Sequence, residues 1–100
     1  MWVMVLFDLP VLTKSQRKAA TRFRNDLLDL GFEMSQFSVY LRHFAGKEQA
    51  EVAVRKIGAV VPATGAVHVL TFTDRQYAAM VCFDGRTVGR KKSRDQFVLF

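Results

Sequence analysis

The sequence opens with MWVMVLFDLP, residues 1–10, and this stretch decides the fold. Every residue from Trp2 to Phe7 is apolar, without the polar–apolar alternation of a strand that has one solvated face. A strand of this kind is expected to be buried on both faces, in the central part of a sheet. Because Pro10 has no amide hydrogen to donate to a ladder, the strand ends before it. Asp8 therefore follows a buried strand directly.

The composition indicates one soluble domain. The chain has 100 residues, of which 50% are hydrophobic, enough for a single globular core. No apolar run reaches the ~18 residues that a membrane span needs. The start also lacks a secretory signal, and the one cysteine, Cys82, cannot form an internal disulfide. We therefore expect a cytoplasmic protein.

The charge favours a polyanionic partner. Fifteen Lys and Arg residues against nine Asp and Glu residues give a net charge of +6, and nucleic acid is the commonest partner of such proteins. The alternative is a soluble basic protein without such a partner. Residues 86–94, RTVGRKKSR, hold five basic residues in nine, including Arg90, Lys91 and Lys92. This loop either contacts phosphates without sequence preference or is merely solvated.

A first helix is predicted from Thr13, which has the capping-box spacing to Gln16, to a stop at Gly31. One face of this helix is apolar and is formed by Ala20, Phe23, Leu27 and Leu30. A second face is basic and carries Lys14, Lys18 and Arg22, with Arg17 and Arg24 at the edge of the apolar stripe. The basic face is either a solvated helix surface or a surface that contacts phosphates.

The remaining elements follow from periodicity. Residues 32–44, FEMSQFSVYLRHF, predict two short strands or one bent strand. Ala50, Ala53, Val54 and Ile57 predict a second helix, which Gly58 and Pro62 end. The last part of the chain predicts a strand over 66–73, a turn or short helix over 74–80, and small strands over 81–83 and 96–100.

The resulting order is βαββαβ with additional C-terminal strands, an α+β arrangement. Right-handed crossovers place both helices on one face of a four-stranded sheet, which is a ferredoxin-like domain. We expect one domain, with a core over residues 1–84 and a basic loop and terminal strand over 85–100. The strands at 2–7 and 66–73 are apolar on both faces, but the helices cover only one. We therefore infer a homodimer with stacked sheets, in which the terminal strand could extend the partner's sheet.

Asp8 then becomes the first candidate site residue. A carboxylate at a strand end must be solvated, hydrogen-bonded, paired with a cation or bound to a metal, and bonding to the loop amides after it is the simplest alternative. If a two-fold axis passes nearby, two Asp8 carboxylates converge and favour a shared Mg²⁺ ion, which takes one or two carboxylates and several waters. A metal beside a basic surface is suited to phosphodiester hydrolysis. His43 and His68 have no spaced ligand partner and are interpreted as structural, and Cys82 as a small core residue.

The sequence also resembles a known family, the CRISPR-associated protein 2 family, most closely its members from type II systems. The similarity covers most of the chain and rests on FDLP at 7–10, the first helix with residues 13–32, GFEMSQFSVYLR at 31–42, Pro62, Gly65, LTFTDRQ at 70–76, and Met80. Family members form ferredoxin-like homodimers. They are metal-dependent endonucleases acting on RNA or DNA, and they bridge the CRISPR integrase, CRISPR-associated protein 1, in the spacer-integration complex.

The resemblance implies roles for particular residues. Asp8 takes the position of the metal-binding aspartate, one from each protomer, and Phe7 the aromatic position before it. Arg17 takes a basic position on the first helix, and Tyr40 the aromatic position of the Ser-Val-aromatic segment. Where some members carry a basic residue two positions before the glutamine, this chain has Met34, which implies a weaker nuclease.

Two interpretations follow. In the first, the protein is a Mg²⁺-dependent endonuclease with Asp8 as metal ligand and Arg17 positioning the backbone. In the second, it is a non-catalytic dimeric scaffold that binds duplex DNA through Lys14, Lys18, Arg22 and the 86–94 loop and docks the integrase. A third possibility, a small-molecule regulator of the same fold, is disfavoured by the charge.

Overall fold

A computed structural model gives the structure of the chain and describes residues 1–85. Its elements are β1 (Trp2–Asp8), α1 (Lys14–Asp29), β2 (Glu33–Gln36), β3 (Val39–His43), α2 (Lys47–Gly58), β4 (Ala66–Phe72) and α3 (Asp74–Ala78). The predicted βαββαβ order is confirmed, and residues 32–44 form two strands rather than one.

The sheet has the order β2-β3-β1-β4, and every neighbouring pair is antiparallel. Strand β1 lies inside the sheet, as its uninterrupted apolar run predicts. All seven of its residues pair with β4, from Trp2 opposite Phe72 to Asp8 opposite Ala66. The first strand is thus held on both sides by strands that come much later in the chain.

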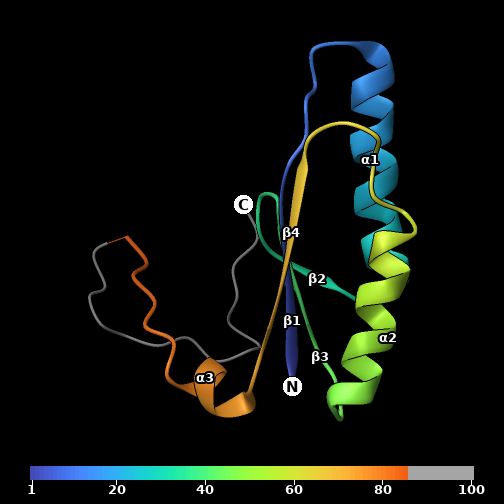
Figure 1. The fold of residues 1–100 in the computed structure, drawn as a ribbon. Coiled ribbons are helices and arrows are strands. Elements are labelled where there is room, and N and C mark those ends of the chain that lie inside the picture. Colours follow the sequence, from blue (N-terminus) through green and yellow to red (C-terminus); the bar gives the residue numbers. More distant parts are fainter. Residues whose placement is uncertain (86–100) are drawn as a thin grey trace.

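Both long helices cover the same face of this sheet (Figure 1). Because side chains alternate along a strand, Val3, Val5 and Phe7 point toward the helices, and all three are buried. They pack in a core with α1 residues such as Phe23, whose ring meets that of Phe7 edge-on at 5.1 Å between centroids. The helix-covered face is therefore a closed hydrophobic layer.

Helix α1 begins with the predicted capping box. The Thr13 hydroxyl accepts a hydrogen bond from the Gln16 amide at 3.1 Å, and the Gln16 side chain accepts one from the Thr13 amide at 3.0 Å. Ala20, Phe23 and Leu27 are buried on the apolar face, and Gly31 follows the helix with φ +84°. The sequence signals at both ends of this helix are confirmed.

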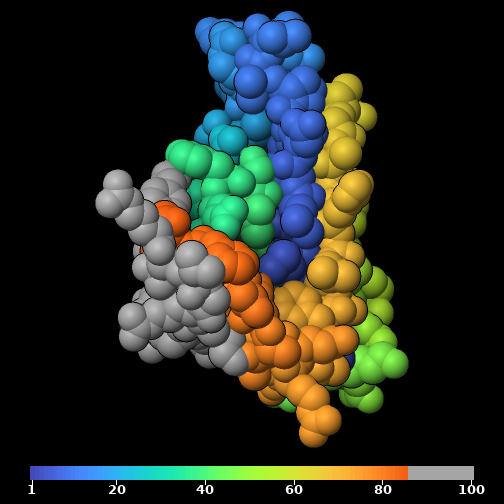
Figure 2. Space-filling view, turned by 90° about the vertical axis from the view of Figure 1, so that its left-hand side faces the viewer, coloured from blue at the N-terminus to red at the C-terminus, as the bar shows by residue number. Residues whose placement is uncertain are grey.

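The opposite face of the sheet is only partly covered within residues 1–85. At the end where β1 starts, the Tyr77 ring of α3 stacks on Trp2 with 3.9 Å between centroids. Farther along, Met4 and Leu6 are half-buried, and Leu70 of β4 is 54% exposed. In Figure 2, which views this side, β1 (blue) is open between the β2–β3 hairpin (green) and β4 (gold), above the segment that contains α3. We call this open part of the sheet the uncovered face.

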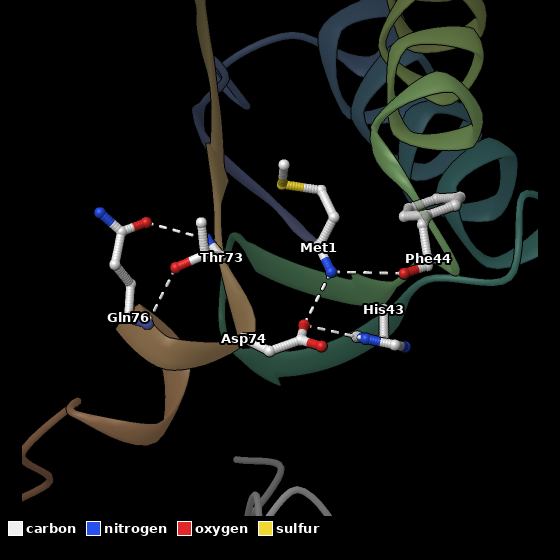
Figure 3. Close-up of polar contacts among 6 residues, drawn as sticks. All are labelled: Met1, His43, Phe44, Thr73, Asp74 and Gln76. Carbon is white, nitrogen blue, oxygen red and sulfur yellow. Dashed lines mark hydrogen bonds and ion pairs between the residues drawn. The ribbon is translucent and has the colours of Figure 1, made fainter.

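The first residue is held by a small polar cluster (Figure 3). The Met1 ammonium donates hydrogen bonds to the Asp74 carboxylate at 2.7 Å and to the Phe44 carbonyl at 3.4 Å. The His43 Nε2 atom lies 3.0 Å from the same Asp74 oxygen. The hydrogen bond from the ammonium, with help from His43, lowers the pKa of Asp74 below its ordinary value. This cluster connects the start of β1 to the end of β3 and the start of α3.

One predicted strand does not form. Residues 81–83 have no strand structure, and Val81 and Phe83 are 59% and 67% exposed. Strand propensity acts through pairing and packing against a neighbour, and apolar residues alone do not provide that neighbour. The predicted strand at 96–100 and the basic loop at 86–94 lie outside the described residues. Within the described part, no helix is long and apolar enough to cross a membrane.

Candidate active site at the end of strand β1

The Asp8 carboxylate is exposed at the end of the central strand. It shares its face with Met4 and Leu6, so it lies on the uncovered face rather than the helix-covered one. Gly65 passes directly behind it: a Cβ atom at Gly65 would lie 2.7 Å from the Asp8 carbonyl oxygen. Gly65 also has φ +92°, a conformation that favours glycine. The start of β4 therefore fixes the backbone that carries the carboxylate.

An open hollow of about 340 Å³ adjoins this carboxylate. It lies where the end of β1, the β2–β3 turn and the start of β4 meet. We call it the Asp8 hollow; its lining includes Leu6, Asp8, Phe37, Ser38, Val39 and His68. Most of this surface is apolar, and Asp8 and His68 are its two ionisable side chains.

The β2–β3 turn is held against β1 by a backbone hydrogen bond. Ser38 adopts the left-handed conformation with φ +62°, and its carbonyl accepts a hydrogen bond from the Phe7 amide at 3.0 Å. The turn is thus bonded to the residue immediately before Asp8. This contact fixes the backbone of the turn beside the end of β1.

The sequence model of a family described as CRISPR associated protein Cas2 matches residues 1–80. The chain belongs to the Cas2 family. A relative from Paracidovorax avenae is 52% identical over all of this chain and 94% of its own length. One from Parvibaculum lavamentivorans is 54% identical over 86% of this chain and 85% of its own, and one from Flavobacterium psychrophilum is 43% identical over all of this chain and 88% of its own. Each bears the name CRISPR-associated endoribonuclease Cas2.

Two of the residues matched to the Cas2 family pattern lie away from the Asp8 carboxylate. Phe7 and Tyr40 are 7% and 2% exposed, and their rings stack with 5.7 Å between centroids. Both point into the core between sheet and helices, on the opposite side of the sheet from the carboxylate. The structure therefore gives these rings a packing position beneath the end of β1.

The Arg17 side chain bonds to nearby backbone atoms. Its Nη1 atom donates hydrogen bonds to the carbonyls of Val11 and Leu12, each at 3.2 Å. These bonds join α1 to the connection that follows Asp8. Arg17 is thus close to Asp8 in the sequence, but these hydrogen bonds go to the loop after Asp8 and not to the Asp8 carboxylate.

The basic residues of α1 form one surface. Lys14, Lys18 and Arg22 are exposed and, with Arg17, line a single shallow area on the helix. This area belongs to the helix layer and not to the uncovered face. The other basic candidates, Arg90, Lys91 and Lys92, lie outside the described residues.

A metal would depend on a second source of ligands. Within residues 1–85, no group of three or more His, Cys, Asp or Glu side chains is placed to hold a metal ion. One exposed carboxylate with free access to water does fit Mg²⁺, which keeps several waters and takes one or two carboxylates. The donor set of one chain is therefore compatible with half of a shared Mg²⁺ site.

The sequence pattern does not indicate Phe37 or His68 as site residues, and it favours a structural role for His68. Both line the Asp8 hollow, and both are exposed. The pairing of β1 with β4 places His68 opposite Leu6, on the same face as Asp8. Only the strand register carries this information, because the two strands are distant in the chain. His43, by contrast, contacts Asp74 as a structural residue would.

Proposed function

We propose that this member of the Cas2 family is a Mg²⁺-dependent endonuclease that hydrolyses phosphodiester bonds, acting as a homodimer with one Asp8 from each protomer. The observation that carries the proposal is an exposed carboxylate, rigidly held at the end of a central strand, on a sheet face that the described residues leave uncovered. The relatives' names, which specify endoribonucleases, support RNA as the first substrate to test.

The same face supports a dimer. Met4 and Leu70 lie there with no covering layer among residues 1–85, and stacking two such faces would remove apolar area from water. Because Asp8 is at one end of this face, a two-fold axis near that end would bring two carboxylates together. Two like charges at close range favour a shared cation.

The residues of the chain then have distinct tasks. The paired Asp8 side chains would hold the ion, which when bound supplies an activated water and stabilises charge on the scissile phosphate. Phe7 and Tyr40 would support the strand end from the core, and Arg17 would hold the loop after Asp8. We further propose that the protein belongs to a type II system and that its dimer bridges the CRISPR integrase in spacer acquisition.

Cleavage of labelled single-stranded RNA and duplex DNA, with Mg²⁺ or with EDTA, tests the nuclease. We expect wild-type protein and an Asp29→Ala control, which removes an exposed carboxylate of α1, to cut only with Mg²⁺. Asp8→Ala is expected to lose cutting by at least about a hundredfold, as loss of a metal or charge-stabilising group typically costs, while it remains a dimer. Equal cutting by Asp8→Ala would move the activity to another site or a contaminant. No cutting by any protein would refute the nuclease.

The exposed basic surface of α1 supports a second candidate, a dimeric scaffold that binds duplex DNA. Here Lys18→Glu with Arg22→Glu should weaken binding of duplex DNA and flatten its dependence on salt concentration. The matched control is Lys47→Glu with Lys56→Glu, which reverses two exposed charges on α2. If both pairs leave affinity unchanged, the α1 surface does not bind DNA.

A further inference from the structure

We propose that the Asp8 hollow is a subsite for one unpaired nucleotide, with the Phe37 ring as the platform on which its base stacks. The inference deepens the proposed function, because it states which form of nucleic acid reaches Asp8. It concerns binding, and its test does not require that the strand be cut.

The Phe37 side chain is 69% exposed, whereas Phe7, Phe23, Phe32 and Phe44 are all buried in the core. Phe83 is similarly exposed, but it does not line a hollow beside a candidate catalytic carboxylate. Phe37 thus presents an aromatic surface at the site without contributing to the core.

The backbone of the turn that carries Phe37 is held by the left-handed conformation of Ser38 and by the hydrogen bond from the Phe7 amide to the Ser38 carbonyl. A backbone that is ordered before binding loses little conformational freedom when a ligand stacks on a side chain of the turn. The same bond sets the position of this backbone relative to Asp8, the residue after Phe7.

The lining of the Asp8 hollow combines apolar walls with polar and charged atoms. Leu6 and Val39 provide apolar walls suited to the faces of a base, and Ser38 and His68 offer polar atoms at its edge. Asp8 lies at the same hollow and would meet the phosphate through a cation. An apolar side chain from a second protein copy would instead strip water from the carboxylate, which is costly without a compensating partner. A nucleotide suits the whole hollow, because its base matches the apolar walls and its phosphate matches Asp8 with a cation between them.

An exposed aromatic ring distinguishes single-stranded from double-stranded nucleic acid. Bases inside a duplex are already stacked on both faces, so an exposed side-chain ring can stack on an unpaired base but not on an internal base pair. The subsite therefore favours single-stranded nucleic acid over the interior of a duplex. Duplex DNA that binds on the α1 surface would not use it.

The test measures binding of a short labelled single-stranded RNA by fluorescence anisotropy in EDTA, where metal-dependent cutting is absent. Phe37→Leu keeps the apolar character but removes the aromatic face, and Phe37→Tyr keeps both. We expect Phe37→Leu to weaken RNA binding about 5- to 100-fold, the effect of losing one base–aromatic stack. Phe37→Tyr should bind like the wild type, and duplex DNA should bind all three proteins equally.

A series of RNAs with one abasic position each provides the matching change in the ligand. One abasic position should weaken binding to the wild type and have no further effect on Phe37→Leu. Wild-type affinity in Phe37→Leu would overturn the proposal. So would dissociation of the dimer by Phe37→Leu in sedimentation, since the ring would then contact a second copy. Cleavage that fails in every protein would refute the nuclease alone, whereas normal cleavage with no effect of Phe37 would refute the subsite alone.

Discussion

At Gly65 the chain passes so close to Asp8 that no side chain fits between them. The nearest atoms to a Cβ there would be the Asp8 carbonyl oxygen at 2.7 Å and a Leu9 methyl at 2.9 Å. The backbone oxygen cannot rotate aside as a flexible side chain could. Glycine at this position therefore sets where the candidate catalytic carboxylate stands.

Gly65→Ala is expected to destabilise the protein by about 1–3 kcal/mol, since it adds a strained left-handed residue to a close backbone contact. Urea denaturation measures this. Gly58→Ala is the control: a Cβ at Gly58, the last residue of α2, meets nothing within 4 Å, and alanine favours a helix by up to about 1 kcal/mol. Equal stability changes in the two variants would show that the contact behind Asp8 is unimportant.

Some of the candidate site residues can be predicted from the sequence, and others cannot. Asp8 stands out because a carboxylate directly follows an apolar strand, and this pattern is local. Phe37 and His68 do not stand out, because their position beside Asp8 depends on a turn conformation and on a strand register across the sheet. The aromatic rings of Phe7 and Tyr40 match a family pattern, but their burial is a property of the folded sheet.

At the scale of elements, two helices begin with the same device. Thr13 and Gln16 form a capping box at α1, and Thr73 and Gln76 form one at α3. The hydroxyl-to-amide distances are both 3.1 Å. The helices differ in what they bury: α1 contributes three buried residues to the core, and α3 contributes none.

Removing the two caps should therefore have different consequences. Thr13→Ala is expected to cost about 0.5–2 kcal/mol of global stability. Thr73→Ala should loosen α3 without lowering the global midpoint as much, because a peripheral element can open by itself. Trp2 is the one tryptophan and stacks on Tyr77 of α3, so its fluorescence reports this loosening. An equal shift of the global midpoint in both variants would mean that α3 unfolds with the core.

The elements are the most predictable part of the molecule. Capping residues, apolar periodicity and glycine stops are encoded within a few neighbouring positions, as Thr13, Phe23 and Gly31 illustrate. The wrongly predicted strand at 81–83 has apolar residues but pairs with neither edge strand of the described sheet; among these neighbouring positions only Asp84 forms a single β-bridge. Pairing is a property of two segments, and one segment alone does not contain it.

At the scale of the whole molecule, the uncovered face offers the sharpest test of self-association. Leu70 is 54% exposed on β4, and Leu28 is 51% exposed on α1, in the other layer. We expect Leu70→Asp to convert a dimer into a folded monomer in sedimentation velocity, because it puts a charge into the apolar seam. Leu28→Asp should leave the dimer intact. A monomeric wild type, or a dimeric Leu70→Asp variant, would exclude this face as the interface.

The layering of helices on one side was predictable from the right-handed crossover rule and the element order. Strands that are apolar on both faces predict a cover for the second side as well, and this stays a prediction for the open part of the face. The position of α3 on the remaining part could not be predicted, because its Trp2–Tyr77 contact joins residues far apart in the sequence.

The central place of β1 also has a consequence for how the chain folds during synthesis. Strand β1 is made first, yet it pairs with β3 and with β4, and its Trp2 pairs with Phe72. Contacts between residues so far apart in the sequence form slowly, because the chain loses the conformational entropy of a long loop before these contacts can stabilise it. The most apolar stretch of the chain therefore waits for most of the domain to be translated, and its sheet completes only after β4 has left the ribosome.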